Sequence, residues 1–136
     1  MAYQVIYYRD SKGIEPVNNT IDSLNACCQV SADWYINLLN RLDDKNPTLG
    51  DPYSSALKGR DYRGFRELRV ECEHRHHRII YRRSRRFWIL LHMIPNKTIE
   101  IPEGDKATAL ARWRDFVDRM NSVPRDNPRA MGHDAP

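Results

Sequence analysis

The chain has 136 residues, of which 40% are hydrophobic and 29% charged, and its formal net charge is +4. This size and composition predict one domain with one core, and they exclude a chain that is disordered throughout. A small positive charge permits a nucleic acid partner without requiring one, so the placement of the charge matters more than its total.

The apolar runs and the cysteine spacing indicate the cellular compartment in which the protein is expected. The longest apolar run, Phe87 to Ile94, is too short to span a bilayer, and the first residues lack the basic flank and apolar stretch of a signal peptide. Cys27, Cys28 and Cys72 form neither a disulfide framework nor a CxxC pair, and neighbouring cysteines rarely bridge each other. We therefore expect free thiols in a reducing, cytoplasmic compartment and no membrane association.

The first half of the chain predicts one strand followed by helix. Residues 3–8 are aromatic and β-branched, as in a strand, and turn-forming residues follow them. From residue 18 to residue 44 apolar side chains recur at helical spacing, which predicts one bent helix or two. Residues 46–64 are rich in Pro, Gly, Asp and Ser, so no regular element is predicted there. The capping candidates are Asn18, Asn19 and Thr20 for the first helical segment and Ser31 for a second one.

The second half predicts three strands and a helix. Residues 68–72 alternate between apolar and charged side chains, which is the period of a half-buried strand. Residues 78–82 predict a second strand, and the apolar run 87–94 suits a third strand that is covered on both sides. We expect these strands to form an antiparallel meander. A last helix is predicted over residues 106–120, with an apolar stripe that packs on the sheet.

These elements predict a single domain over residues 1–121. The tail, residues 122–136, contains three prolines and one glycine and has no apolar period. We expect this tail to be disordered.

The segment HRHHRIIYRRSRRFW, residues 74–88, concentrates positive charge. It contains six arginines and three histidines, and no acidic residue lies between His74 and Arg86. Like charges at this density repel one another, so we expect something outside the fold to neutralise them.

Four short motifs in this half of the chain occur in a familiar order. They are E-L-R at 67–69, R-I-x-Y at 78–81, L-L-H at 90–92 and K-T at 97–98, followed by a helix that contains Ala107 and Arg112. Together they resemble the RelE/HigB toxin superfamily, in particular its phage-derived HigB-type branch, most strongly over residues 57–119. The resemblance implies an α+β, RelE-like fold. In that fold, N-terminal helices and a C-terminal helix pack on a small, twisted, mostly antiparallel sheet that has a basic concave surface.

The same resemblance implies a function. Members of the superfamily are commonly toxins of type II toxin-antitoxin systems and ribosome-dependent mRNA endonucleases that inhibit translation. Cleavage uses the ribose 2′-hydroxyl as nucleophile, so no metal and no cofactor are expected. The implied partners are mRNA, the ribosome and a cognate antitoxin of the helix-turn-helix HigA type, with DNA contacted only through that antitoxin.

A non-catalytic RNA- or protein-binding module with a RelE-like fold is the alternative. Some relatives carry a tyrosine shortly after the basic loop, and the segment TIEIPEGDK at residues 98–106 contains none, which favours a module that binds without cutting. In a third possibility, the basic hairpin mainly receives an acidic segment of a partner such as the antitoxin.

Basic side chains are the candidate phosphate ligands, because a guanidinium can grip two phosphate oxygens. By strand parity Arg69 points away from the core, and the resemblance places it at the catalytic surface. Arg78 is expected beside Arg69 if the turn between their strands centres near residues 74–76, and Lys97 matches a basic position of the family. Lys58 is a weaker RNA-binding candidate. The competing interpretations are a strand arginine paired with a neighbouring glutamate for Arg69, an arginine spread over the sheet edge for Arg78, and an ordinary loop lysine for Lys97.

His92 and Tyr81 are the candidates for proton transfer, because an imidazole titrates near neutrality and a phenol can exchange a proton. A lone histidine in an apolar strand is more often a hydrogen-bonded structural residue, and Tyr81 can equally be a packing residue. Both alternatives therefore stay open.

Two further groups of residues complete the prediction. We expect the hairpin tip to dock on ribosomal RNA through Arg82, Arg83, Arg85 and Arg86. Zinc-ligand types are also clustered, at Cys72, His74, His76 and His77. We expect no metal there, because neighbouring arginines would repel the ion and no second ligand pair completes a tetrahedron.

Overall fold

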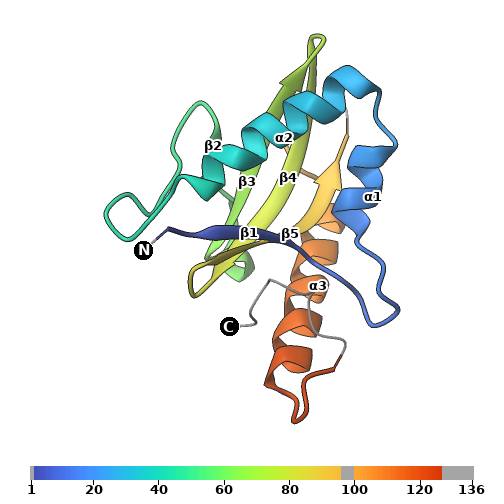
Figure 1. Cartoon of the computed structure of the whole chain (residues 1–136), viewed down its shortest axis with the longest axis vertical. Helices are drawn as coiled ribbons and strands as arrows, with labels where there is room; N and C mark the ends of the chain where they lie inside the picture. The colour runs from blue at the N-terminus through green and yellow to red at the C-terminus, as the bar shows by residue number, and fades with distance from the viewer. Residues whose placement is uncertain (1, 96–99, 127–136) are drawn as a thin grey trace.

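The computed structural model describes residues 2–95 and 100–126. Its elements are β1 (Gln4–Tyr7), α1 (Pro16–Asp22), α2 (Ala26–Asn40), β2 (Ser54–Ala56), the short 3-10 helix η1 (Arg60–Tyr62), β3 (Phe65–Cys72), β4 (Arg75–Ser84), β5 (Phe87–Ile94) and α3 (Glu103–Asn121). Three helices pack on a five-stranded sheet (Figure 1). The expected α+β fold is therefore confirmed.

The sheet has the strand order β1-β5-β4-β3-β2. Strands β2 to β5 pair antiparallel in sequence, so the predicted meander of three strands is present, and β1 pairs parallel with β5. The register between β4 and β5 shifts between Ile80 and Tyr81. Such a bulge changes which face the following side chains meet.

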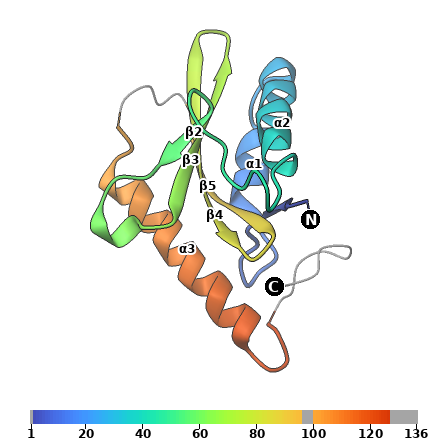
Figure 2. The same cartoon turned by 90° about the vertical axis from the view of Figure 1, so that its left-hand side faces the viewer.

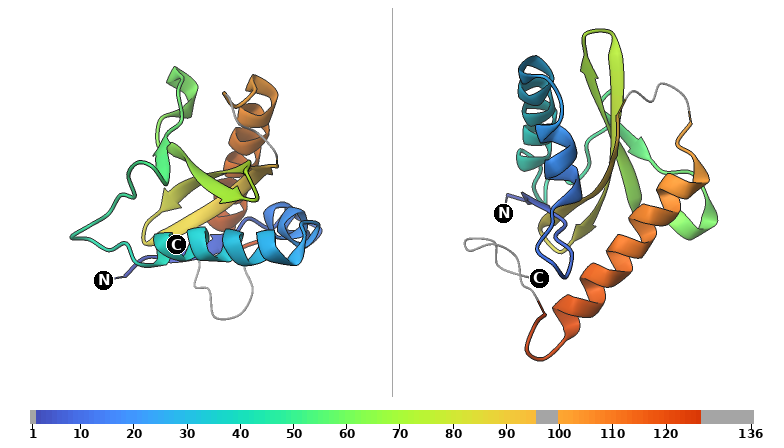
Figure 3. Two further views of the ribbon diagram at one scale, coloured as in Figure 1. Left: turned by 90° about the horizontal axis from the view of Figure 1, so that it is seen from above. Right: turned by 90° about the vertical axis from the view of Figure 1, so that its right-hand side faces the viewer.

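The helices cover both faces of the sheet: α1 and α2 lie on one face and α3 lies on the other (Figures 2 and 3). Each face has its own apolar cluster. The α2 side buries residues such as Leu39, Leu68 and Tyr81, and the α3 side buries Ile80 and Phe116 among others. Strand β5 is therefore apolar along nearly its whole length, because it is covered from both sides.

The helical region is two helices, and its predicted caps were wrong. Helix α1 begins at Pro16, whose fixed φ suits the first helical position, and Glu15 precedes it as the cap. Helix α2 is capped by Asn25, whose side-chain oxygen accepts a hydrogen bond from the Cys28 backbone N–H at 2.8 Å. Ser31 lies inside α2 and caps nothing.

Two elements fall in the region where none was predicted. Strand β2 is only three residues long, Ser54–Ala56, and it pairs with β3 through its backbone. Its sequence has no apolar alternation, so no pattern indicated a strand. The short 3-10 helix, η1, follows it.

The expectation that all three cysteines are free thiols was wrong. Cys28 of α2 and Cys72 at the end of β3 form a disulfide across 44 residues of sequence, and Cys27 is free and exposed. The neighbouring cysteines Cys27 and Cys28 do not bridge each other, but the fold brings the distant Cys72 next to Cys28.

No helix within residues 2–95 and 100–126 is long and apolar enough to cross a bilayer. The first residues of the predicted tail are described, and the Asp126 backbone N–H donates to the Arg119 carbonyl at 3.2 Å. The remaining tail residues, 127–136, lie outside the described residues, so their predicted disorder stays a prediction.

Candidate functional site

A cleft of about 370 Å³ opens on the α3 side of the sheet. The strands β2, β3 and β4 form its floor, and the loop after β2 and the start of α3 form its walls. The lining residues are Ser55, Ala56, Leu57, Lys58, Glu67, Arg69, Arg78, Glu100, Ile101 and Lys106. Four of them are basic and two are acidic, so the cleft carries an excess of positive charge.

Arg69 and Arg78 lie directly opposite each other on the paired strands β3 and β4. Glu67 precedes Arg69 by two residues and therefore points to the same face of the sheet. One oxygen of the Glu67 carboxylate, Oε1, accepts hydrogen bonds from Arg69 Nε at 3.2 Å and from Arg78 Nη1. Glu67 is only 9% exposed. The predicted juxtaposition of the two arginines is therefore confirmed, and a buried carboxylate holds them together.

The Arg69 guanidinium is engaged on all sides by protein acceptors. Besides Glu67, it donates to the Ser55 hydroxyl at 2.7 Å, to the Pro52 carbonyl at 3.3 Å and to the Asp51 carboxylate at 3.1 Å. Asp51 is 81% exposed, so its ion pair with Arg69 is weak. Arg69 therefore does pair with a neighbouring strand glutamate, Glu67, as the competing interpretation expected. A phosphate could reach this group by displacing Asp51.

Two lysines complete the basic lining. Lys58 is exposed in the loop after β2, and Lys106 lies in the first turns of α3. The Lys106 Nζ donates to the Lys58 carbonyl at 3.0 Å and lies 5.5 Å from the centre of the Tyr62 ring. The position of Lys106 in the cleft was not predicted, because a lysine near the start of a helix has no distinguishing sequence pattern. Lys97 lies outside the described residues, so its predicted role cannot be placed.

His92 is held as part of the packing of α3 and does not line the cleft. Its Nδ1 accepts a hydrogen bond from Arg112 Nη1 at 2.9 Å, and its Nε2 lies 2.7 Å from Asp105 Oδ1. Because the guanidinium can only donate, Nδ1 must be an acceptor, and Nε2–H then donates to Asp105. This arrangement supports the structural interpretation of His92.

Tyr81 lies in the core on the α2 side of the sheet. Its side chain is fully buried, and its hydroxyl is 2.5 Å from the hydroxyl of Ser54, which is also buried. Burial raises the pKa of Tyr81, which makes proton release harder. This position matches the alternative interpretation of Tyr81 as a packing residue, because its side chain lies in the core on the face of the sheet opposite the cleft. A role of Tyr81 in proton transfer stays a prediction.

The four hairpin arginines do not form the single tip that was predicted. Only Arg85 and Arg86 lie in the two-residue turn between β4 and β5, whereas Arg82 and Arg83 belong to β4 and face opposite sides of the sheet. Arg82 lies over the rings of Phe65 and Trp113, at 4.9 and 4.6 Å.

Arg83 lies over the ring of Tyr3 at 5.0 Å and donates to its hydroxyl. Both Arg82 and Arg83 therefore stabilise the packing around the sheet. Their predicted role in binding RNA remains untested.

The basic run divides into two parts at opposite ends of β4. Arg78 lies near the β3–β4 turn and Arg85 lies in the β4–β5 turn, and Figure 1 shows the two turns pointing in different directions. Six residues of strand lie between these two arginines, so their Cα atoms are seven steps apart, or about 23 Å at ~3.3 Å per step. One phosphate group cannot contact both parts.

The fold and the cleft define a small α+β protein with a basic cleft on one face of its sheet. The chain belongs to the phage-derived Gp49-like protein family (DUF891), whose family model matches residues 21–114. No curated protein and no solved structure matches the chain. The matched range contains every residue that lines the cleft.

Proposed function

We propose that the protein is the toxin of a toxin-antitoxin pair and an endoribonuclease that cuts mRNA on the ribosome. Family membership and the motifs shared with RelE/HigB toxins support the class of protein. The single observation that supports nuclease chemistry is the buried Glu67 carboxylate, which two arginines hold in a basic cleft.

RNA supplies its own nucleophile, so this chemistry needs few groups. A base removes the proton of the ribose 2′-hydroxyl, and the oxygen forms a bond to the adjacent phosphorus. The bond from phosphorus to the 5′ oxygen of the next nucleotide breaks, and that oxygen takes up a proton. The products are a 2′,3′-cyclic phosphate and a 5′-hydroxyl, and neither metal nor cofactor takes part.

The cleft residues can supply a base, stabilise the transition-state charge and bind the neighbouring phosphates. Glu67 can accept the 2′-hydroxyl proton, since its carboxylate lines the floor of the cleft beside both arginines. Arg69 and Arg78 can stabilise the extra negative charge on phosphorus oxygens in the transition state. Lys58 and Lys106 can hold neighbouring phosphates. Water, or a group of the ribosome, protonates the leaving oxygen in this scheme.

Cleavage of an actively translated mRNA tests the proposal. The wild-type protein should produce cuts positioned by codons, mapped by primer extension in a cell-free translation system. Arg69→Ala should abolish the cuts, because it removes a transition-state contact. Glu71→Gln provides a matched control, because Glu71 is exposed on the same strand and the same face but does not line the cleft.

A non-catalytic binding module is the second candidate. The observation that favours it is the complete engagement of Arg69 by protein acceptors, which leaves this group less available to a substrate. A module of this kind would bind ribosomes or RNA in the same assay without producing cuts. In either case we expect a cognate antitoxin as a partner, because the cleft offers it a basic surface.

A further inference from the structure

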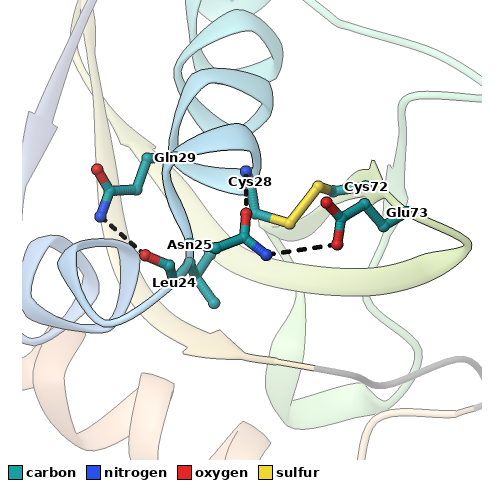
Figure 4. Close-up of a disulfide and its surroundings, with 6 residues drawn as sticks. All are labelled: Leu24, Asn25, Cys28, Gln29, Cys72 and Glu73. Carbon is teal, nitrogen blue, oxygen red and sulfur yellow. Dashed lines mark hydrogen bonds between the residues drawn. A yellow bond between two sulfur atoms is a disulfide. The ribbon is translucent and has the colours of Figure 1, made fainter.

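The three cysteines and Glu73 lie together where the N-terminus of α2 meets the β3–β4 turn. Cys27 and Cys28 are in the first turn of α2, and Cys72 is the last residue of β3. A sulfur or oxygen atom from each of Cys27, Cys72 and Glu73 lies within 4.8 Å of the others. Cys28 is bonded to Cys72, so its sulfur belongs to the same cluster (Figure 4).

We propose that the reduced protein binds one zinc ion through the thiolates of Cys27, Cys28 and Cys72 and the carboxylate of Glu73. The disulfide and the zinc site are alternative states of the same cluster, because Cys28 and Cys72 take part in both.

The spacing of the ligand atoms fits a tetrahedral zinc. Zinc–sulfur bonds of ~2.3 Å place the sulfur atoms about 3.8 Å apart. Cys27, Cys72 and Glu73 already offer their ligand atoms within 4.8 Å of one another, so these three need movements of only about 1 Å. The sulfur atoms of Cys28 and Cys72 must also move apart to zinc-bound spacing once their bond is reduced. The Cα atoms of Cys28 and Cys72 are 5.5 Å apart, so their reduced side chains remain neighbours.

Asn25 orients the carboxylate ligand. Its Oδ1 caps α2 by accepting from the Cys28 N–H at 2.8 Å, and its Nδ2 donates to Glu73 Oε2 at 3.4 Å (Figure 4). One side chain therefore fixes both the helix turn that carries two thiols and the turn that carries Glu73. Hydrogen bonds of this kind to metal ligands are typical of metal sites.

The turn that presents Glu73 is also unusual. Glu73 and His74 both adopt positive φ angles, 52° and 64°, which favour Asn and Gly in a two-residue hairpin turn. Glu73 places a carboxylate at the first position of this turn, directly after Cys72. A ligand role accounts for a carboxylate at this position.

Local charge also favours the ion. Three thiolates and one carboxylate leave a site with bound Zn²⁺ at net negative charge, and Arg75 lies opposite Cys72 on the paired strand. From the sequence, Arg75 was expected to repel a metal ion. With the ligands in the structure, Arg75 instead compensates the excess negative charge of the site.

The two states are linked by a balanced reaction. A dithiol reductant transfers two electrons and two protons to the Cys28–Cys72 disulfide and becomes a disulfide itself. Zinc then binds and displaces the protons of the three thiols, so zinc uptake releases protons and depends on pH.

Zinc binding to the full-length chain tests the proposal. The protein is reduced without oxygen by a phosphine and titrated with zinc against a chromophoric chelator. We expect one zinc per reduced chain and no comparable binding by the disulfide form. Removing groups around a metal site weakens binding by ~10–100-fold, and losing a ligand should cost at least as much. We expect this loss for Cys27→Ser and a similar or smaller loss for Glu73→Gln.

Two controls make the result decisive. Cys27 is exposed and outside the disulfide, so Cys27→Ser should keep the fold and the Cys28–Cys72 bond, verified by circular dichroism and thiol counting. Glu71→Gln removes one negative charge from the same hairpin and should leave zinc affinity unchanged. The proposal is overturned if the reduced protein binds no zinc, or if Cys27→Ser binds it as tightly as the wild type.

Discussion

At the scale of single residues, the centre of the cleft is a carboxylate shared by two arginines. An arginine pair directly opposed on neighbouring strands would repel if left alone. Glu67 compensates that repulsion and keeps both guanidinium groups in fixed positions. A site arranged in advance costs less reorganisation when a phosphate binds, which is how electrostatic catalysis gains its effect.

Asp51 should oppose RNA binding. It is an exposed ion-pair partner of Arg69 and competes with a phosphate for the same group. Asp51→Asn is expected to tighten binding of an RNA that lacks the reactive 2′-hydroxyl by about two- to fivefold, the size of one surface ion pair. Fluorescence anisotropy measures this affinity. Asp118→Asn on α3 removes the same charge far from Arg69, and an equal gain from that variant would contradict a specific role for Asp51.

At the scale of elements, β4 carries two separate sets of arginines. Arg82 lies between aromatic rings from β3 and α3, and burial lowers its pKa. Arg85 lies in the turn that follows the strand. Alternation along the strand and the position of the turn therefore decide what each arginine does, although their sequence context is the same.

Substitution should separate these two arginines. Arg82→Ala is expected to lower the free energy of unfolding by about 1–2 kcal/mol, through lost ring contacts and lost packing. Arg85→Ala should leave stability within about 0.5 kcal/mol of the wild type. Urea denaturation followed by tryptophan fluorescence measures both. A larger loss of stability for Arg85→Ala than for Arg82→Ala would contradict the packing role of Arg82.

Helix α3 is anchored to the sheet by a hydrogen-bonded tyrosine. The Tyr8 hydroxyl donates to Asp115 at 2.6 Å, and burial together with this carboxylate raises the pKa of Tyr8 to about 12. The tyrosine pKa in the unfolded chain is about 10, so the folded state favours the neutral phenol. The stability this provides is complete below pH 10 and is lost as the pH rises from 10 to 12.

A pH series of unfolding measurements checks this anchor. The free energy of unfolding should fall between pH 10 and pH 12, and Tyr8→Phe should make that fall shallower. Some slope should remain in the variant, because burial also raises the pKa of Tyr7 to about 12. An unchanged slope in Tyr8→Phe would show that Tyr8 does not titrate with the fold.

At the scale of the whole molecule, local patterns predicted the fold better than the site. Alternation along β3 and the apolar run of β5 predicted the meander, and strand parity predicted that Arg69 leaves the core. These features depend only on neighbouring residues. Strand β2 was missed because its three residues, Ser54–Ala56, show no apolar alternation.

Contacts between distant segments account for the remaining differences. The disulfide joins residues 44 positions apart, and Lys106 reaches the cleft only because α3 begins beside the loop after β2. Glu67 was predicted only as a charge partner for Arg69, because its contact with Arg78 depends on strand register. Register and helix placement are properties of the assembled chain, so the composition of the cleft could not be predicted from any one segment.

The most direct test of the proposed chemistry is the rate of mRNA cleavage by Glu67→Gln on translating ribosomes. Glutamine can still accept hydrogen bonds from both arginines but cannot take a proton from the 2′-hydroxyl. If Glu67 is the base, cleavage should slow by about 10²–10⁴-fold. Ribosome binding should stay close to that of the wild type, whereas the thermal midpoint should fall, because the neutral side chain no longer compensates the charge of the two arginines. A folded Glu67→Gln protein that cleaves at the wild-type rate would contradict this assignment.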